Sequence, residues 1–186
     1  MAIARPHLTL EEFLRRPEEK PALEFDEGVV TQKVSPKTKH SRMQFTAAQK
    51  LDAAGVPNRV AMAFPELRVT FAGRSVVPDV SVFRWTRIPR TADGGFQNDV
   101  VTPPDIAVEI ASPEQSANAL VRRCLWYVAN GVPIAVLIDP EDETVLVFRP
   151  NAVPLPVEGD ETIDLREVLP DFHLPARELF AALRPD

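Results

Sequence analysis

The sequence predicts an α/β domain with a mixed central β-sheet, on three observations. Hydrophobic residues make up 45% of the 186 positions, which is enough for a single core of ordinary size. Segments that alternate like strands are interspersed with segments of helical period along the chain. A strand over residues 105–111, a helix over 113–130 and an apolar strand over 134–138 then follow in the order of a right-handed crossover between parallel strands.

The first half of the chain is expected to form two helices and several short strands. Thr9 and Glu12 have the spacing of a capping box, which predicts a helix that stops near Pro17. A second helix, over residues 38–54, is expected to end at Gly55 in the left-handed conformation. The strands expected in this half lie at residues 23–25, 29–31, 67–71 and 76–83.

The second half begins with a long loop over residues 86–104 and continues with the crossover. Ser112 and Pro113 have the pattern of a helix start, and Gly131 is placed to cap the end of the same helix. The last strand of the crossover is expected to form a hairpin with a strand at residues 144–148.

The remaining tail is expected to be an extension rather than a second domain. We divide the chain into a domain of residues 1–150 and a C-terminal extension of residues 151–186 that packs on the same domain. The extension has many prolines, a candidate strand at 162–165 and a short helix at 175–183. Neither an internal repeat nor a linker divides the chain.

Composition excludes several classes of protein. A single cysteine, Cys124, rules out an intrachain disulfide and any site built from several cysteines; on the apolar stripe of its helix it is expected to be buried and inert. The apolar runs are too short to span a bilayer, residues 1–8 lack the pattern of a secretion signal, and a cytoplasmic protein is predicted. A Gly-rich phosphate loop and a nucleophile elbow are missing, which argues against a small-molecule α/β enzyme.

Two basic segments stand out against a formal net charge of -6. Residues 33–42 contain five Lys, Arg or His side chains, and Arg84, Arg87 and Arg90 form a second cluster. The overall charge argues against a broad, non-specific binder of nucleic acid, whereas a local basic groove depends on how the charges are distributed. The sequence leaves open whether these segments form such a groove or are ordinary solvated loops.

Two acidic residues lie in apolar strands, where a carboxylate needs an explanation. Asp79 shares one strand face with Ser81, and Glu109 shares its face with Ala107 and Ala111, whose small side chains leave room around it. If the two strands are neighbours, the carboxylates converge and need a proton or a cation between them. Oxygen ligands of this kind suit Mg²⁺ or Mn²⁺, although a solvated strand face remains the alternative.

The order of several motifs resembles a known family. They are LTLEEFL at residues 8–14, VPDV at 77–80, PDIAVEIASP at 104–113 and LIDP at 137–140. Over roughly residues 8 to 150, the chain is similar to the Uma-type family of restriction-endonuclease-like proteins, which is placed in the PD-(D/E)XK nuclease superfamily. The resemblance implies a restriction-endonuclease-like core, with a mixed central β-sheet flanked by helices.

The resemblance also implies a catalytic site. Asp79 and Glu109 would bind Mg²⁺ or Mn²⁺, Glu24 of the first hairpin would be a third metal ligand, and the reaction would be hydrolysis of a DNA phosphodiester. The superfamily's simplest pattern has a lysine two residues after the glutamate, where this chain has Ala111. The family's own lysine, on the following helix, is replaced by Arg123, which can contact phosphate but cannot act as a base.

Further residues are candidates for substrate binding. They are His40, which matches a frequent histidine of the family, its neighbour Lys39, and Tyr127. Structural roles stay open for each: His40 as a surface or capping residue and Tyr127 as part of the core. The sequence thus predicts a metal-dependent DNA endonuclease or, because of the lost lysine, an inactive nuclease-fold binding or assembly protein. A homodimer is also left open, because the apolar strand at 144–148 would offer an edge for pairing.

Overall fold

The structure is a computed structural model that describes residues 8–184. The prediction that residues 1–8 are not a secretion signal therefore concerns residues that, except for Leu8, lie outside the described part. The helices are α1 (Leu10–Leu14), α2 (Thr38–Gly55), α3 (Ala117–Ala129) and α4 (Ala176–Phe180), with single 3-10 turns at Trp85–Arg87 and Ala181–Leu183. The strands are β1 (Leu23–Asp26), β2 (Val29–Gln32), β3 (Ala61–Pro65), β4 (Val69–Phe71), β5 (Arg74–Val76), β6 (Val80–Arg84), β7 (Ile106–Ile110), β8 (Ile134–Asp139), β9 (Thr144–Phe148) and β10 (Pro156–Val157).

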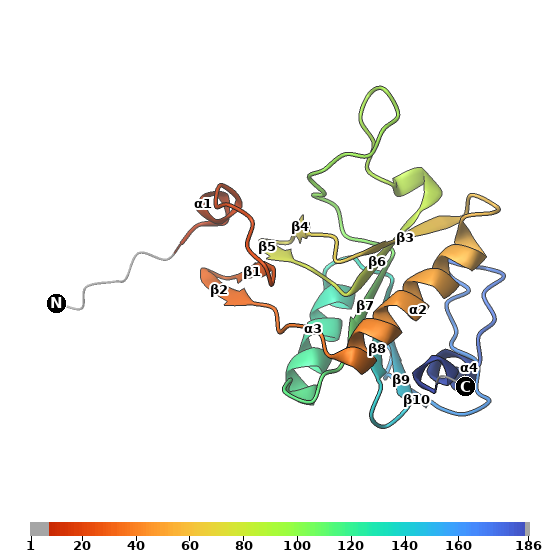
Figure 1. The fold of residues 1–186 in the computed structure, drawn as a ribbon. Coiled ribbons are helices and arrows are strands. Elements are labelled where there is room, and N and C mark those ends of the chain that lie inside the picture. Colours follow the sequence, from red (N-terminus) through yellow and green to blue (C-terminus); the bar gives the residue numbers. More distant parts are fainter. Residues whose placement is uncertain (1–7, 185–186) are drawn as a thin grey trace.

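These strands form a large mixed sheet and a smaller antiparallel one. The central sheet has six strands in the order β10-β9-β8-β7-β6-β3, and the smaller sheet has four in the order β2-β1-β5-β4. In the central sheet β7 and β8 are parallel and are joined by α3, whereas the other pairs are antiparallel. The predicted fold class is confirmed, and Figure 1 shows the central sheet between α2 and α3.

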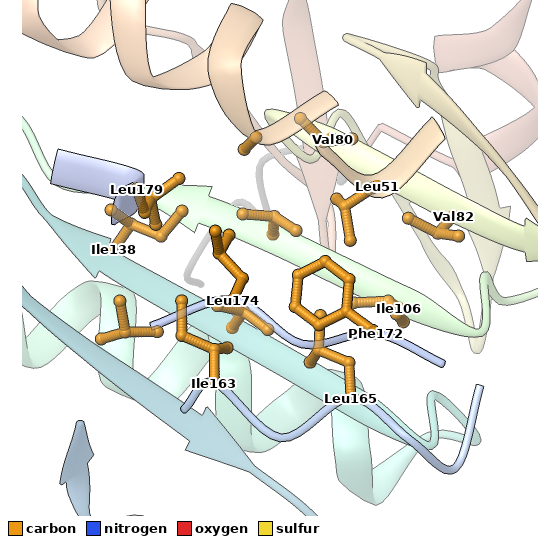
Figure 2. Packing of buried hydrophobic residues seen from close by; sticks show 14 of the residues in the cluster. Leu51, Val80, Val82, Ile106, Ile138, Ile163, Leu165, Phe172, Leu174 and Leu179 are labelled. Carbon is orange, nitrogen blue, oxygen red and sulfur yellow. The ribbon is translucent and has the colours of Figure 1, made fainter. Parts of the chain in front are cut away.

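One face of the central sheet is covered by α2 and by the C-terminal part of the chain. Ile106, Val108 and Ile110 of β7 point to this face, and Leu51 of α2 packs against them in the same cluster. Figure 2 shows the side chains that the C-terminal segment adds to this core: Ile163, Leu165, Phe172, Leu174 and Leu179. Segment and sheet therefore bury apolar surface against each other, which is the main stabilising contribution to such a layer.

The opposite face lies under α3. Leu120, Cys124 and Tyr127 of this helix are buried against Ala107 of β7 and Leu137 of β8. The burial expected for the cysteine is confirmed, and burial raises the pKa of its thiol, which disfavours the reactive thiolate. Because successive residues of a strand alternate between faces, every β7 side chain that shares the face of Ala107 points at α3.

The predicted strand over residues 76–83 is wrong in one respect that matters for the site. It is two strands, because the chain leaves the smaller sheet at Val76 and joins the central sheet at Val80. Pro78 lies in the gap, where its missing N–H costs no ladder hydrogen bond. Asp79 therefore lies immediately before a strand of the central sheet rather than inside one continuous strand.

Other boundaries differ from expectation for local reasons. Gly55 is the last residue of α2 and has no left-handed φ; a Cβ there would lie 2.5 Å from the carbonyl oxygen of Ala61, so glycine permits close backbone approach. Helix α3 begins at Ala117 rather than 113, whereas Gly131 after it has the expected positive φ of 95°. The candidate strand at 162–165 is reduced to a single bridge from Thr162 to Pro175.

Two further expectations concern surfaces. The apolar strand β9 is not a sheet edge, because the two residues of β10 pair with it. The edge proposed for dimer pairing is thus partly covered. Within residues 8–184, no helix combines the length and apolar character needed to cross a membrane.

Two of the three arginines of the second basic cluster, Arg84 and Arg87, have a structural partner. The Asp105 carboxylate is fully buried. It accepts a hydrogen bond of 2.8 Å from the backbone N–H of Arg84 and forms an ion pair of 2.6 Å with the Arg87 guanidinium. The Arg84 guanidinium pairs with the same carboxylate. The Asp105 carboxylate therefore fixes the end of β6 to the start of β7.

We expect Asp105→Asn to lower the free energy of unfolding by about 1–3 kcal/mol, because a buried, charge-assisted set of hydrogen bonds is lost. Urea unfolding measures this change. Asp99→Asn, at an exposed position of the nearby loop, is the matched control and should stay within about 0.5 kcal/mol of the wild-type protein. Equal stability of the two variants would show that Asp105 contributes nothing beyond its shape.

Candidate functional site

The two strand carboxylates lie next to each other. Strands β6 and β7 are antiparallel neighbours in which Val80 pairs with Val108, so Asp79, one residue before, comes opposite Glu109, one residue after. Both are buried: their side chains are 3% and 4% exposed, respectively. The alternative of a solvated strand face is therefore wrong for both residues, and each buried charge must find partners inside the protein.

Asp79 is held by three groups. Its Oδ2 atom accepts hydrogen bonds from the backbone N–H of Ile110, at 2.8 Å, and lies 3.1 Å from His40 Nε2. Its Oδ1 atom accepts a hydrogen bond of 2.7 Å from the ammonium group of Lys33. Burial alone would raise the pKa of the Asp79 carboxyl, but His40 and Lys33 outweigh burial and lower it to about 2. Asp79 is thus ionised at neutral pH.

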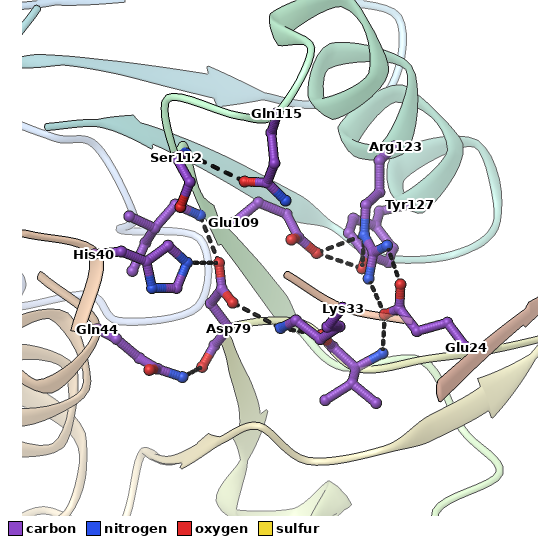
Figure 3. A network of polar contacts seen from close by, with 12 residues as sticks. Glu24, Lys33, His40, Gln44, Asp79, Glu109, Ser112, Gln115, Arg123 and Tyr127 are labelled. Carbon is purple, nitrogen blue, oxygen red and sulfur yellow. Dashed lines mark hydrogen bonds and ion pairs between the residues drawn. The ribbon is translucent and has the colours of Figure 1, made fainter. Parts of the chain in front are cut away.

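Glu109 is bound through one oxygen only. Its Oε1 atom accepts hydrogen bonds of 2.7 Å from Arg123 Nε and 2.6 Å from the Tyr127 hydroxyl. Its Oε2 atom accepts none from the described residues. Burial raises the pKa of the Glu109 carboxyl, and the charge of Asp79 adds to this although Arg123 opposes it. The room that the sequence predicted around Glu109 is filled by Arg123 and Tyr127 from α3, as Figure 3 shows.

Glu24 reaches the site from the smaller sheet. Arg123 Nη1 donates to its Oε2 atom at 2.7 Å, Arg123 Nη2 donates to Oε1, and the backbone N–H of Val77 donates to Oε1 at 2.7 Å. Burial would raise the pKa of the Glu24 carboxyl, but Arg123 and Val77 outweigh burial and lower it. Both oxygens of Glu24 therefore accept hydrogen bonds from Arg123, and one of them also accepts a hydrogen bond from the backbone of Val77.

Arg123 connects two of the acids. Its guanidinium binds Glu24 in a two-pronged manner and Glu109 through Nε, which also lies 2.9 Å from the hydroxyl oxygen of Tyr127. Burial would lower the pKa of this group, but the negative charges of Glu109 and Glu24 raise it well above its ordinary value. Arg123 thus fixes the carboxylates of Glu24 and Glu109 in place.

Lys33 is the functional candidate that the sequence did not single out. It lies in the segment between β2 and α2, where the sequence showed only a run of basic residues. Its ammonium group donates to Asp79 Oδ1 and, at 2.8 Å, to the carbonyl oxygen of Val77. Burial would lower the pKa of Lys33, but the charges of Asp79 and Glu109 raise it. The only available signal was its membership of the basic segment.

The other members of that segment have individual partners instead of forming one groove. Lys37 pairs with Glu114, and Lys39 pairs with Glu141 at 2.6 Å on the surface. His40 is buried and bound to Asp79, so its surface reading is wrong.

Tyr127 likewise is fully buried and bound to Glu109. His40 and Tyr127 therefore orient the two carboxylates. Substrate binding by His40, Lys39 and Tyr127 stays a prediction.

The donor set fits a hard divalent cation bound by two carboxylates. Within residues 8–184, no three His, Cys, Asp or Glu side chains are arranged to hold a metal ion. Mg²⁺, however, is commonly held by one or two carboxylates together with water and substrate phosphate. Glu109 Oε2 accepts no hydrogen bond from the described residues and Asp79 Oδ1 accepts only that of the Lys33 ammonium group, so these two oxygens would hold the ion once Lys33 moves away. Glu24 as a direct ligand stays a prediction, because Arg123 occupies both of its oxygens.

A large open pocket borders the site on the side of α3. Its volume is about 720 Å³, and the hairpin β1–β2 and α3 form its walls. Glu24 and Arg123 line it, together with Arg74, Arg122 and Trp126, whereas Asp79 and Glu109 do not. The pocket thus gives solvent access to the Arg123–Glu24 pair, and the two strand carboxylates lie deeper.

A solved structure defines the class of protein. The crystal structure described as that of "a putative nuclease belonging to DUF820 from Anabaena variabilis ATCC 29413" has a TM-score of 0.91 and 38% sequence identity. The match covers 95% of this chain and 99% of that chain. The fold is therefore that of a nuclease-like protein with a mixed central sheet.

A family model identifies the chain further. The model of Uma2, described as "Putative restriction endonuclease", matches residues 10–177, and the chain belongs to this family. The resemblance stated from the sequence is thereby confirmed, and the match extends beyond residue 150 into the C-terminal extension. No curated protein matches the sequence.

Proposed function

We propose that this member of the family is a divalent-metal-dependent DNA endonuclease. The observation that carries the proposal is the pair of buried carboxylates, Asp79 and Glu109, at adjacent positions of two neighbouring strands. Glu109 Oε2 has no hydrogen bond to the described residues, and Asp79 Oδ1 is bound only by the ammonium group of Lys33, whereas the other oxygen of each carboxylate is fixed by Ile110 and His40 or by Arg123 and Tyr127. Bound there, Mg²⁺ or Mn²⁺ would lower the pKa of a water molecule and neutralise charge on the scissile phosphate.

The protein's own residues would position this chemistry. His40 and the backbone N–H of Ile110 fix the orientation of Asp79, and Tyr127 and Arg123 fix that of Glu109. Such supporting contacts keep the ligands of a metal site in place and typically change its affinity by about 10–100-fold. Cleavage of DNA is the reaction that fits the family description, and DNA binding and a homodimer are parts of the proposal.

The alternative is a protein that keeps the nuclease fold without turnover. It is favoured by one observation: the guanidinium of Arg123, the residue that the resemblance puts at the family's lysine position, is bound to Glu24 and Glu109. An arginine that is always protonated cannot replace a lysine as a base. Metal binding without cleavage would identify this second function.

Cleavage of supercoiled plasmid DNA tests the proposal. We expect nicked and linear products with Mg²⁺ or Mn²⁺, no products with EDTA, and a rate at least about 100-fold lower for Asp79→Asn, which loses a proposed ligand. Glu178→Gln, an exposed carboxyl of α4, is the control and should cleave at the wild-type rate. No cleavage by the wild-type protein across divalent ions and DNA substrates would overturn the proposed function.

A further inference from the structure

We infer that Lys33 is the catalytic lysine of this site and has two roles. In the metal-free protein its ammonium group takes the place of a divalent cation at Asp79, and in the working enzyme it contacts the substrate phosphate. This inference rests on the proposed endonuclease function. Ala111 carries no charge, and the charge of Arg123 is already paired with Glu24 and Glu109. Lys33, in the segment between β2 and α2, would therefore provide the positive charge for the substrate. The contacts of Lys33 carry the argument.

The ammonium group of Lys33 lies where a cation is needed. It donates to one carboxylate oxygen, Asp79 Oδ1 at 2.7 Å, and to one backbone carbonyl oxygen, that of Val77 at 2.8 Å. Both are hard oxygen ligands of the kind that Mg²⁺ prefers. Glu109 and Glu24 add negative charge around the same position. Lys33 thus supplies a counter-charge to the buried Asp79 carboxylate, whereas Arg123 supplies that of Glu24 and Glu109.

Lys33 can leave this position more easily than Arg123 can leave its own. Its two hydrogen bonds come from one terminal nitrogen on a flexible four-carbon stem, whereas the planar guanidinium of Arg123 is bound to Glu24, Glu109 and Tyr127 at once. The side chain of Lys33 is 13% exposed against 3% for Asp79, so Lys33 is the more solvent-accessible partner of this ion pair.

The two roles belong to one exchange. While no divalent ion is bound, the ammonium group pairs with Asp79 Oδ1. Once that oxygen serves the metal, the ammonium charge is available to a phosphate oxygen, where a fixed positive charge stabilises the charge that develops during hydrolysis. No proton transfer by Lys33 is needed for this role. Removing the charge should therefore affect metal binding and catalysis in opposite directions.

The test compares Lys33→Met and Lys33→Gln with the wild-type protein in two measurements. Calorimetric titration with Mn²⁺ should show about 10-fold tighter binding by both variants, because a competing cation is gone. Plasmid cleavage at saturating Mn²⁺ should be at least about 100-fold slower, because a charge on the phosphate is lost. A purely structural lysine would instead weaken both. Lys37→Met, an exposed lysine of the same segment, is the control and should match the wild-type protein in both measurements.

Several outcomes would overturn the inference. Unchanged or weaker Mn²⁺ binding by folded Lys33→Met and Lys33→Gln would show that the ammonium group does not hold the cation's place. Cleavage by these variants at the wild-type rate would exclude a catalytic role. If the wild-type protein binds Mn²⁺ but cleaves no DNA, the endonuclease proposal fails, while tighter binding by the variants still supports the exchange. Thermal melting of each variant verifies folding, and the glutamine keeps a donor for Val77 if methionine does not fold.

Discussion

Replacing Arg123 with alanine is expected to lower the free energy of unfolding by about 3–5 kcal/mol, because two buried carboxylates lose their shared counter-charge. Glu24 would keep only the backbone N–H of Val77, and Glu109 only the Tyr127 hydroxyl, among the hydrogen bonds that hold them now. Urea unfolding at neutral pH gives the change directly. An effect of this size would make Arg123 the main link between the smaller sheet and α3.

The neighbouring arginine provides the control. Arg122 lies on the same helix at an exposed position, so Arg122→Ala should change the free energy of unfolding by less than about 0.5 kcal/mol. A loss below about 1 kcal/mol for Arg123→Ala would mean that water replaces the guanidinium at both carboxylates. Arg123→Lys adds a second comparison, since lysine keeps the charge but not the two-pronged contact with Glu24.

Glu109→Gln is expected to separate activity from stability. The substitution removes a proposed metal ligand, so Mn²⁺ affinity and plasmid cleavage should each fall by about 100-fold or more. The metal-free protein should be as stable as the wild type or more stable at neutral pH, because glutamine has the shape of glutamate without the cost of a buried charge. Calorimetry, cleavage and urea unfolding of the same preparation measure the three quantities.

The pH dependence of this stability difference has a definite sign. The pKa of Glu109 is raised in the folded protein, so the folded state retains its proton to higher pH than the unfolded chain does. The wild type therefore loses stability as the pH rises from the ordinary glutamate pKa through the raised one, and Glu109→Gln does not. The two proteins should converge in stability at acidic pH. A variant that is much less stable at neutral pH would mean that the Glu109–Arg123 ion pair outweighs the burial cost.

Local patterns were sufficient to predict the fold class and the sheet face on which Glu109 lies, whereas the catalytic site was implied by the family resemblance. The period of two in β7 placed Glu109 on the face opposite Ile106 and Ile110, and the crossover with its helix predicted the parallel neighbour β8. The strand assignment around Asp79 was wrong about where the chain changes sheet, and it left open whether this strand is a neighbour of β7, which the structure shows it to be. These features depend on residues close together in the sequence.

The partners of the carboxylates could not be predicted in the same way. Lys33 and Asp79 are 46 positions apart, and Glu24 and Arg123 are 99 apart, so no periodicity connects them. Their pairing depends on how the smaller sheet packs against the central one. The burial of Asp105 between two arginines was missed for a similar reason, since a carboxylate next to proline has the same local pattern at an exposed turn.

The crossing between the two sheets has an evolutionary consequence. The backbone N–H of Val77 binds Glu24, its carbonyl oxygen binds Lys33, and two residues later comes the Asp79 carboxylate. An exchange of Val77 for another apolar residue leaves all three groups in place, whereas deletion of one residue between 76 and 80 displaces them together. Selection at this crossing should therefore act more strongly on the number of residues than on the side chain at position 77, and related sequences should vary there in type but not in length.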